Sequence, residues 1–119
     1  MMLLKWVLGI LAGFLAAGLV IAVTEAVGHA LVQGEAVFGI AIIAYGLGAA
    51  VGTAVAGRLA GRRSSTLVPI LLGALATINL WSFAHPWWFA IACVGALALG
   101  GLVGDALSRQ FAPARNEEA

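Results

Sequence analysis

Four long apolar stretches, separated by short polar segments, occupy most of the chain. Each stretch approaches the ~20 residues that a helix needs to cross about 30 Å of hydrocarbon. The stretches are apolar on all sides rather than alternating with a period of two, which favours helices over the strands of a membrane barrel. The pattern predicts membrane-spanning helices over residues 3–26, 36–57, 66–84 and 87–107, followed by a flexible tail over 108–119.

The connections between these stretches are short, so consecutive helices should be antiparallel neighbours. The predicted fold is an all-α membrane protein, a four-transmembrane-helix antiparallel bundle that forms a single domain over residues 1–119. The segment from Gly57 to Thr66 is expected to form the middle connection. Pro69 then falls in the first turn of the third helix, where a residue without a backbone N–H is tolerated.

Composition strengthens the membrane interpretation. Of the 119 residues, 63% are hydrophobic and 9% are charged, whereas soluble domains are about 45–50% apolar and about 25% charged. A chain this short and this apolar cannot cover itself with polar surface, so the lipid bilayer is its expected solvent. The net charge of +1 excludes a main role in nucleic-acid binding, which needs a strongly basic face. The single cysteine, Cys93, is expected to be a small buried hydrophobe.

The distribution of charge predicts an orientation. Four antiparallel spans put all six basic residues on one side of the membrane, namely Lys5, Arg58, Arg62, Arg63, Arg109 and Arg115. The other side carries Glu25, Glu35 and both histidines, His29 and His85. The positive-inside rule therefore predicts that both termini are cytoplasmic. The expected location is the inner membrane of a bacterial cell.

Small residues recur at four-residue spacing in three of the predicted helices. This spacing lets helix backbones approach closely in lipid, where the hydrophobic effect gives little drive for helix association. The residues are Gly9, Gly13, Gly48, Gly52, Ala92, Ala96, Gly100 and Gly104. They are expected to pack helices within the bundle, to form a contact between copies of the chain, or both. The stripe over residues 92–108 is the preferred subunit contact.

Glu25 and His29 are four residues apart and share a helix face if the first helix continues past Val23. A carboxylate beside an imidazole could form a proton site or part of a metal site, and Glu35 and His85 are expected on the same side of the membrane. One such pair is short of the three or four ligands that zinc takes. A solvated, hydrogen-bonded pair with no metal and no cofactor is therefore expected, although ligation of a metal or a haem by the two histidines stays open.

Three more polar residues lie in or near the spans. Thr77 and Asn79 fall inside the third predicted helix, where polar side chains usually face the bundle interior and hydrogen-bond across helices. The alternative is that they line a pathway for a solute. Asp105 lies near the cytoplasmic end of the fourth helix, four residues before Arg109. An interfacial ion pair is expected there, with a coupling carboxylate for protons or cations as the alternative.

Three local patterns resemble a group of small bacterial four-span membrane proteins. They are Glu25-Ala-Val-Gly-His29, Gly48-Ala-Ala-Val-Gly52, and Asn79 followed by His85-Pro-Trp-Trp-Phe89. The proline-rich insertion typical of the first loop of that group is missing here. The resemblance implies the fold and the topology but no activity, because the group has no established function.

The sequence contains no nucleophile with its base, no phosphate-binding glycine loop and no paired-carboxylate site, so the chain is not expected to be an enzyme. The favoured function is a non-catalytic structural or accessory subunit, which associates with itself or with a larger membrane complex. The alternative is a small oligomeric channel or transporter for an ion or a small solute, with Glu25 and His29 at the outer mouth and Asn79 lining the path. Small multidrug-resistance transporters, however, carry their carboxylate well inside the first helix, whereas Glu25 lies at its predicted end.

Overall fold

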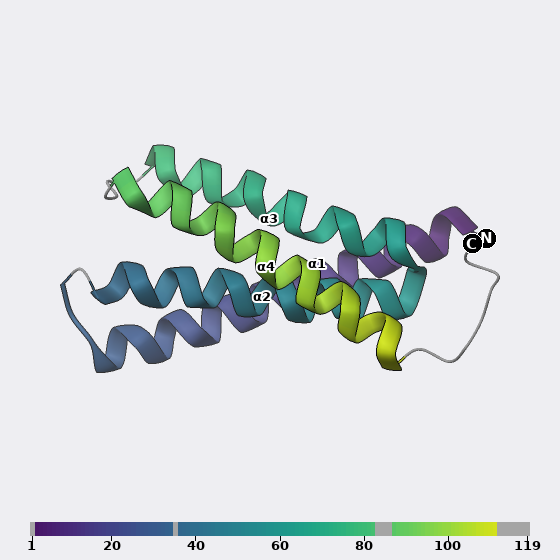
Figure 1. Cartoon of the computed structure of the whole chain (residues 1–119), viewed down its shortest axis with the longest axis horizontal. Helices are drawn as coiled ribbons and strands as arrows, with labels where there is room; N and C mark the ends of the chain where they lie inside the picture. Colours follow the sequence, from purple (N-terminus) through teal and green to yellow (C-terminus); the bar gives the residue numbers. More distant parts are fainter. Residues whose placement is uncertain (1, 35, 83–86, 112–119) are drawn as a thin grey trace.

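The structure is a computed structural model that describes the backbone of residues 2–34, 36–82 and 87–111 and the side chains of residues 3–34, 36–61, 65–78 and 87–110. The described residues form helices and no strand (Figure 1). The helices are α1 (Met2–Leu31), α2 (Ala36–Ala60), α3 (Arg62–Ser82) and α4 (Trp87–Phe111). The structure therefore confirms the all-α four-helix antiparallel bundle.

Three of these helices are long and apolar enough to cross a membrane. The qualifying segments are Leu3–Leu31, Ala36–Ala60 and Trp87–Gln110. In α3 the described apolar stretch is shorter and runs from Ser65 to Ile78. The first segment, with 29 residues, is about 44 Å long at 1.5 Å per residue, so it exceeds the roughly 30 Å of a hydrocarbon core.

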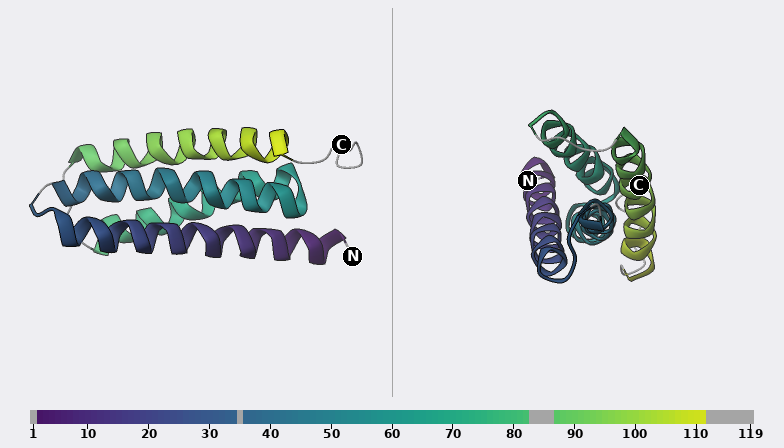
Figure 2. Two further views of the ribbon diagram at one scale, coloured as in Figure 1. Left: turned by 90° about the horizontal axis from the view of Figure 1, so that it is seen from below. Right: turned by 90° about the vertical axis from the view of Figure 1, so that its left-hand side faces the viewer.

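Helix α2 is at the centre of the bundle. It packs against each of the other three helices, whereas α1 and α4 do not contact each other in the described part of the chain. Figure 2 shows α2 almost end-on between its neighbours. Consecutive helices are antiparallel, so α2 and α4 run parallel to each other. Residues of α2 are therefore enclosed on more sides than residues of α1. One face of α1 packs against α2 and α3, and its opposite face contacts no other described helix.

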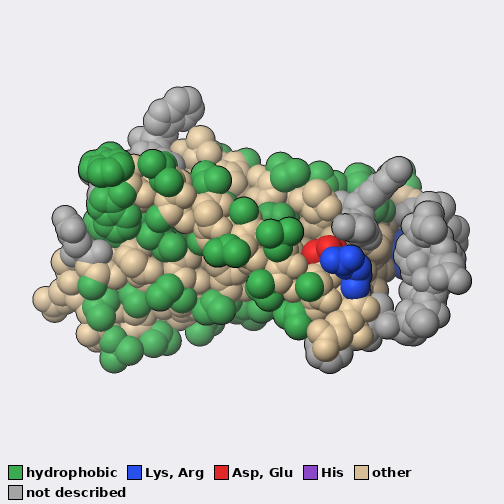
Figure 3. Space-filling model, viewed as in Figure 1, with side chains coloured by type: hydrophobic (Ala, Val, Ile, Leu, Met, Phe, Trp, Pro, Cys, Tyr) green, Lys and Arg blue, Asp and Glu red, His purple; other side chains and the backbone are tan. Residues whose placement is uncertain are grey.

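The bundle buries many of its small side chains and exposes most of its large apolar ones, although Val68, Leu72 and Phe89 are also buried. Alanines 17, 44, 49 and 56 are fully buried. In contrast, Leu15, Leu19 and Leu99 are 72%, 66% and 66% exposed. Hydrophobic side chains cover the length of the molecule, and the charged side chains in view lie near one end (Figure 3). This arrangement suits a lipid environment, where close approach of backbones and not burial of large side chains holds helices together.

Helix α1 extends beyond the expected end at residue 26. No proline interrupts it, and Gly28, the one glycine in its last turns, lies against Ile40 of α2. The helix closes where the Val32 N–H donates to the Gly28 carbonyl over 2.9 Å, shortly before Gly34 adopts a φ of 73°. Only glycine takes up such a positive φ readily, so Gly34 turns the chain into α2.

The segment 57–66, expected to be a connection, is almost entirely helical. Only Gly61, with a φ of 92°, separates α2 from α3. The Gly61 N–H donates to the Gly57 carbonyl, and the Ser65 N–H donates to the Gly61 carbonyl. Because α3 starts at Arg62, Pro69 lies inside the helix rather than in its first turn.

Helix α4 also extends further than expected. Residues 108–111 belong to it and not to a tail. Its other end is fixed by an aromatic cluster, in which Phe38 of α2 meets Trp88 and Phe89 of α4 with ring centroids 6.5 and 5.6 Å away. Both contacts are edge-to-face, the geometry that aromatic quadrupoles favour. The cluster aligns the starts of the two parallel helices.

The helix directions bring basic residues together at one end of the bundle, called the basic end below. Lys5 is near the start of α1, Arg58 near the end of α2, Arg62 and Arg63 at the start of α3, and Arg109 near the end of α4. Arg115 is outside the described residues. Glu25 and His29 lie toward the opposite end, in the last turns of α1.

Candidate functional site

The predicted glycines of the first two helices lie where α1 crosses α2. A Cβ on Gly13 would be 2.5 Å from the carbonyl oxygen of Gly52, and a Cβ on Gly52 would be 2.6 Å from that of Gly13. A Cβ on Gly48 would be 3.0 Å from the carbonyl oxygen of Ala17, and one on Gly9 would meet Ala60. At Gly13 and Gly52 the obstacle is the backbone of the facing helix, so a side chain there would push the two helices apart, and this stripe packs α1 on α2.

The small stripe of α4, which was the preferred subunit contact, packs against α2 of the same chain. A Cβ on Gly100 would meet the carbonyl oxygen of Gly46, and one on Gly104 would meet that of Ala50. Ala96 lies opposite Gly46. This stripe is therefore occupied within the bundle and is not free for another copy. The reason is that α4 lies parallel to α2 and fills the side of α2 that α1 leaves open. Ala92, one turn earlier, is half-buried.

Polar side chains are buried where α2, α3 and α4 meet near the basic end. Thr53, Ser65 and Ser108 are buried, at 1%, 1% and 6% exposure. Gly57 lets the three helices approach closely, because a Cβ at this position would contact the Ser108 hydroxyl and would lie 3.3 Å from the Ser65 Cβ. The three hydroxyl residues and Asp105 form what we call the hydroxyl cluster.

Asp105 belongs to this cluster and is held on two sides. The Ser65 hydroxyl donates to its Oδ1 over 3.4 Å, and the Arg109 guanidinium lies 3.1 Å from its Oδ2. The geometry is that of the expected ion pair at the end of α4. Since the Arg109 side chain is 61% exposed and that of Asp105 is 18% exposed, the pair straddles the bundle surface.

Thr53 differs from its neighbours in the cluster. Its Oγ1 is buried and has no hydrogen-bond partner among the described residues. The sequence carries no signal for Thr53 or Ser65, because Thr53 lies in an apolar span and Ser65 in a segment expected to be a loop. For Ser108 a signal existed, since it continues the four-residue spacing of Gly100 and Gly104.

Glu25 and His29 lie on one face of α1, as their spacing predicted. Glu25 is partly exposed and His29 is exposed. Neither makes an ion pair or a side-chain hydrogen bond with the residues that the structure describes. Glu35 and His85 lie outside the described residues. Within the described residues no three potential ligands among His, Cys, Asp and Glu come together as a metal site.

Thr77 does not face the bundle interior. Its side chain is exposed, and its hydroxyl donates to the Gly73 carbonyl of its own helix over 2.9 Å. The expectation of a hydrogen bond across helices is therefore wrong for Thr77, because the preceding helical turn already satisfies the hydroxyl. The backbone of Asn79 is part of α3, but its side chain lies outside the described residues.

Two open grooves of similar size lie along the seam between α1 and α2. One, of about 330 Å³, is at the basic end and is lined by Leu4, Lys5, Leu8, Gly9 and Leu59. The other, of about 320 Å³, is at the opposite end and is lined by Val23, Thr24, Val27, Gly28, Leu31, Val32 and Ile40. We call them the basic groove and the apolar groove.

Comparison of the chain with protein-family models, with curated proteins and with solved structures found no match.

Proposed function

We propose that this chain is a non-catalytic accessory protein of a membrane, which acts by associating with another membrane helix through the outer face of α1. The partner helix belongs to a second copy of the chain or to a larger complex. The observation that carries the proposal is Gly18, a glycine of α1 with nothing within 4 Å of the position that a Cβ would take.

Gly18 contrasts with the glycines that pack the bundle. Gly13, Gly52 and Gly100 each lie against the backbone of a neighbouring helix, which explains why they lack a side chain. Gly18 is exposed, and Ala22 and Ala26 are exposed at the same four-residue spacing. We call these three residues the outer stripe. Small residues at this spacing allow close approach of a second helix in lipid.

The position of the outer stripe also supports association. In the most apolar part of α1 only 17% of the residues are buried, compared with 33% in α2 and 28% in α4. Glu25 and His29 extend the same side of α1 and have no partner among the described residues. Polar groups near the edge of a bilayer gain from hydrogen-bonding partners on another helix, so the stripe combines close approach with polar contacts.

The alternative function, a channel or transporter, has less support. A transporter needs polar groups around a cavity near the membrane midplane. Among the described side chains the buried ones that carry a hydroxyl are Thr53, Ser65 and Ser108, all in the half of the bundle that carries the basic end, and Tyr45, which lies nearer the middle of α2. Elsewhere the described core is filled by apolar residues such as Leu72 and Leu97. Flux in proteoliposomes that Glu25→Gln abolishes would favour the transporter instead.

The wild-type chain is expressed at its native level and extracted in mild detergent. We expect its mass to be that of a complex heavier than the 12.1 kDa monomer. Gly18→Leu should dissociate the complex into monomers, because the leucine side chain would prevent the close approach of the partner helix. Gly95→Leu is the matched control, since Gly95 of α4 is also exposed with nothing within 4 Å. The measurement is native mass spectrometry. A wild-type monomer, or equal dissociation of both variants, would contradict the proposal.

We also propose that the basic end faces the cytoplasm of a bacterial cell, as the positive-inside rule indicates. Gln33, between α1 and α2, and Gln110, near the end of α4, are both exposed and lie at opposite ends. In a Cys93→Ala background, a membrane-impermeant maleimide added to spheroplasts should label Gln33→Cys and should label Gln110→Cys only after lysis. The reverse pattern would overturn the orientation.

A further inference from the structure

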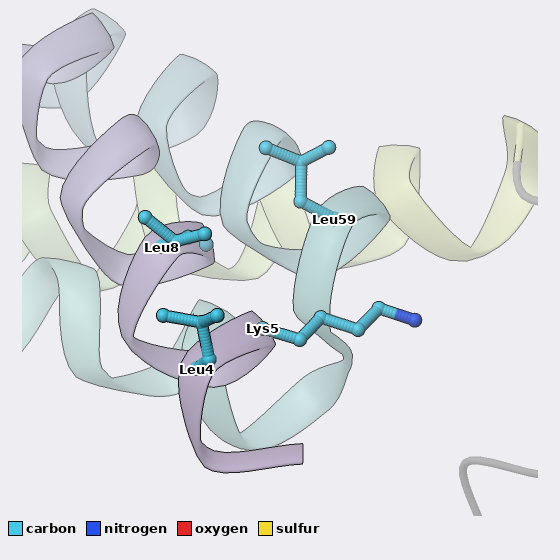
Figure 4. A pocket seen from close by; sticks show the side chains of 5 residues that line it. Leu4, Lys5, Leu8 and Leu59 are labelled. Carbon is cyan, nitrogen blue, oxygen red and sulfur yellow. The ribbon is translucent and has the colours of Figure 1, made fainter. Parts of the chain in front are cut away.

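The basic groove joins an apolar wall to a positive charge. Leu4 and Leu8 of α1 and Leu59 of α2 form the wall, and Lys5 lies beside them (Figure 4). The Lys5 side chain points away from the leucines and carries its nitrogen beyond them. The groove thus has one end suited to hydrocarbon and another suited to an anion.

The charge at this groove is not neutralised within the described residues. Lys5 and Arg58, the residue before Leu59, are exposed and form no ion pair there. The carboxylate of Asp105 is paired with Arg109 on α4, and the described residues of α4 do not contact α1. The field at the mouth of the groove is therefore positive, and an anionic group is its electrostatic complement.

The position of the groove along α1 suits a lipid that has its headgroup at the membrane interface. Lys5 and Glu25 are twenty residues apart on one helix, which is about 30 Å at 1.5 Å per residue. This length matches the thickness of the hydrocarbon core, so a membrane that has Glu25 at one interface has Lys5 at the other, with Leu8 about one helical turn deeper than Leu4.

We propose that the basic groove is a binding site for an anionic phospholipid. One acyl chain lies against Leu4, Leu8 and Leu59, and the phosphate pairs with the ammonium group of Lys5. The apolar groove at the other end of the same seam serves as a comparison within the molecule. It is similar in size, but its lining residues include no Lys or Arg, so it takes hydrocarbon without preference for headgroup charge.

Native mass spectrometry of the delipidated, full-length protein tests the site with two probes that share the same acyl chains, phosphatidylglycerol and phosphatidylcholine. The wild type should retain phosphatidylglycerol in preference. Lys5→Gln should reduce that preference about fivefold, the factor that corresponds to about 1 kcal/mol for one lysine near an anionic surface. Lys5→Arg should keep it. Protection of the buried Cys93 thiol verifies in each case that the bundle is folded.

Arg109→Gln is the charge-matched control, because it removes one positive charge from the same end but on α4. It should leave the preference intact. Leu8→Trp, which fills the groove and keeps Lys5, should weaken retention of phosphatidylglycerol, and glycerol 3-phosphate should not displace the lipid. Equal losses in Lys5→Gln and Arg109→Gln, equal retention of both lipids by the wild type, or full displacement by glycerol 3-phosphate would overturn the proposal.

Discussion

Gly52→Leu should lower the free energy of unfolding by about 2 kcal/mol. Gly52 is the point where three helices meet, since a Cβ there would be 2.6 Å from the Gly13 carbonyl oxygen of α1 and 3.0 Å from a methyl group of Val68 in α3. Overpacking costs about 1–3 kcal/mol, and the upper end applies because the obstacle is backbone. The gain of about 1 kcal/mol in helix propensity offsets part of this cost.

The single cysteine provides the measurement. Cys93 is 2% exposed, so its rate of maleimide labelling in increasing SDS reports unfolding of the bundle. Gly95→Leu is again the control, because its side chain would meet open space and should leave stability unchanged or raise it by up to about 1 kcal/mol. If Gly52→Leu were as stable as Gly95→Leu, the close crossing of α1 and α2 would be disproved.

Thr53→Val and Ser65→Ala should change stability in opposite directions, although each removes one hydroxyl from a residue that is 1% exposed. The Thr53 hydroxyl has no hydrogen-bond partner in the described part of the chain, so valine relieves an unsatisfied polar group and should stabilise the bundle by about 1 kcal/mol. The Ser65 hydroxyl donates to Asp105, so alanine removes a hydrogen bond to a charged group and should cost about 1 kcal/mol or more.

The same Cys93 labelling assay measures both variants. Asp105→Asn provides a cross-check, because the carboxylate is what makes the Ser65 hydrogen bond charge-assisted. In an Asp105→Asn background the cost of Ser65→Ala should shrink. A Thr53→Val variant less stable than the wild type would show that this hydroxyl has a stabilising partner, and would contradict the geometry of the hydroxyl cluster.

The sequence predicted the helices and their directions because lipid imposes simple rules. A helix must be about 20 apolar residues long, and its backbone must satisfy its own hydrogen bonds. The ends of the helices were less predictable, because hydropathy falls where the membrane ends and not where the helix ends. Thus α1 continues through Glu25 and His29, and α2 and α3 continue through the arginines until Gly61.

The packing was predictable in part. Four-residue spacing shows that Gly100 and Gly104 share a face, but not which helix that face meets, because spacing carries no information on how neighbouring helices are rotated. For this reason the sequence left open whether the stripe packs within the bundle or between copies, and the structure has Gly100 and Gly104 against α2 of the same chain. Thr77 illustrates another limit, since a hydroxyl in a helix can bond to its own backbone or to a neighbour and the sequence does not distinguish the two outcomes.

The central position of α2 has a consequence for the order of assembly. Helix α4 is synthesised after α2 and packs on it, with no contact to α1 among the described residues, so the backbone around Gly46 and Ala50 stays open until α4 has been made. A nascent chain with only three helices therefore presents a bare glycine-rich surface to the bilayer. Truncation within α4 should leave that surface of α2 uncovered in the bilayer.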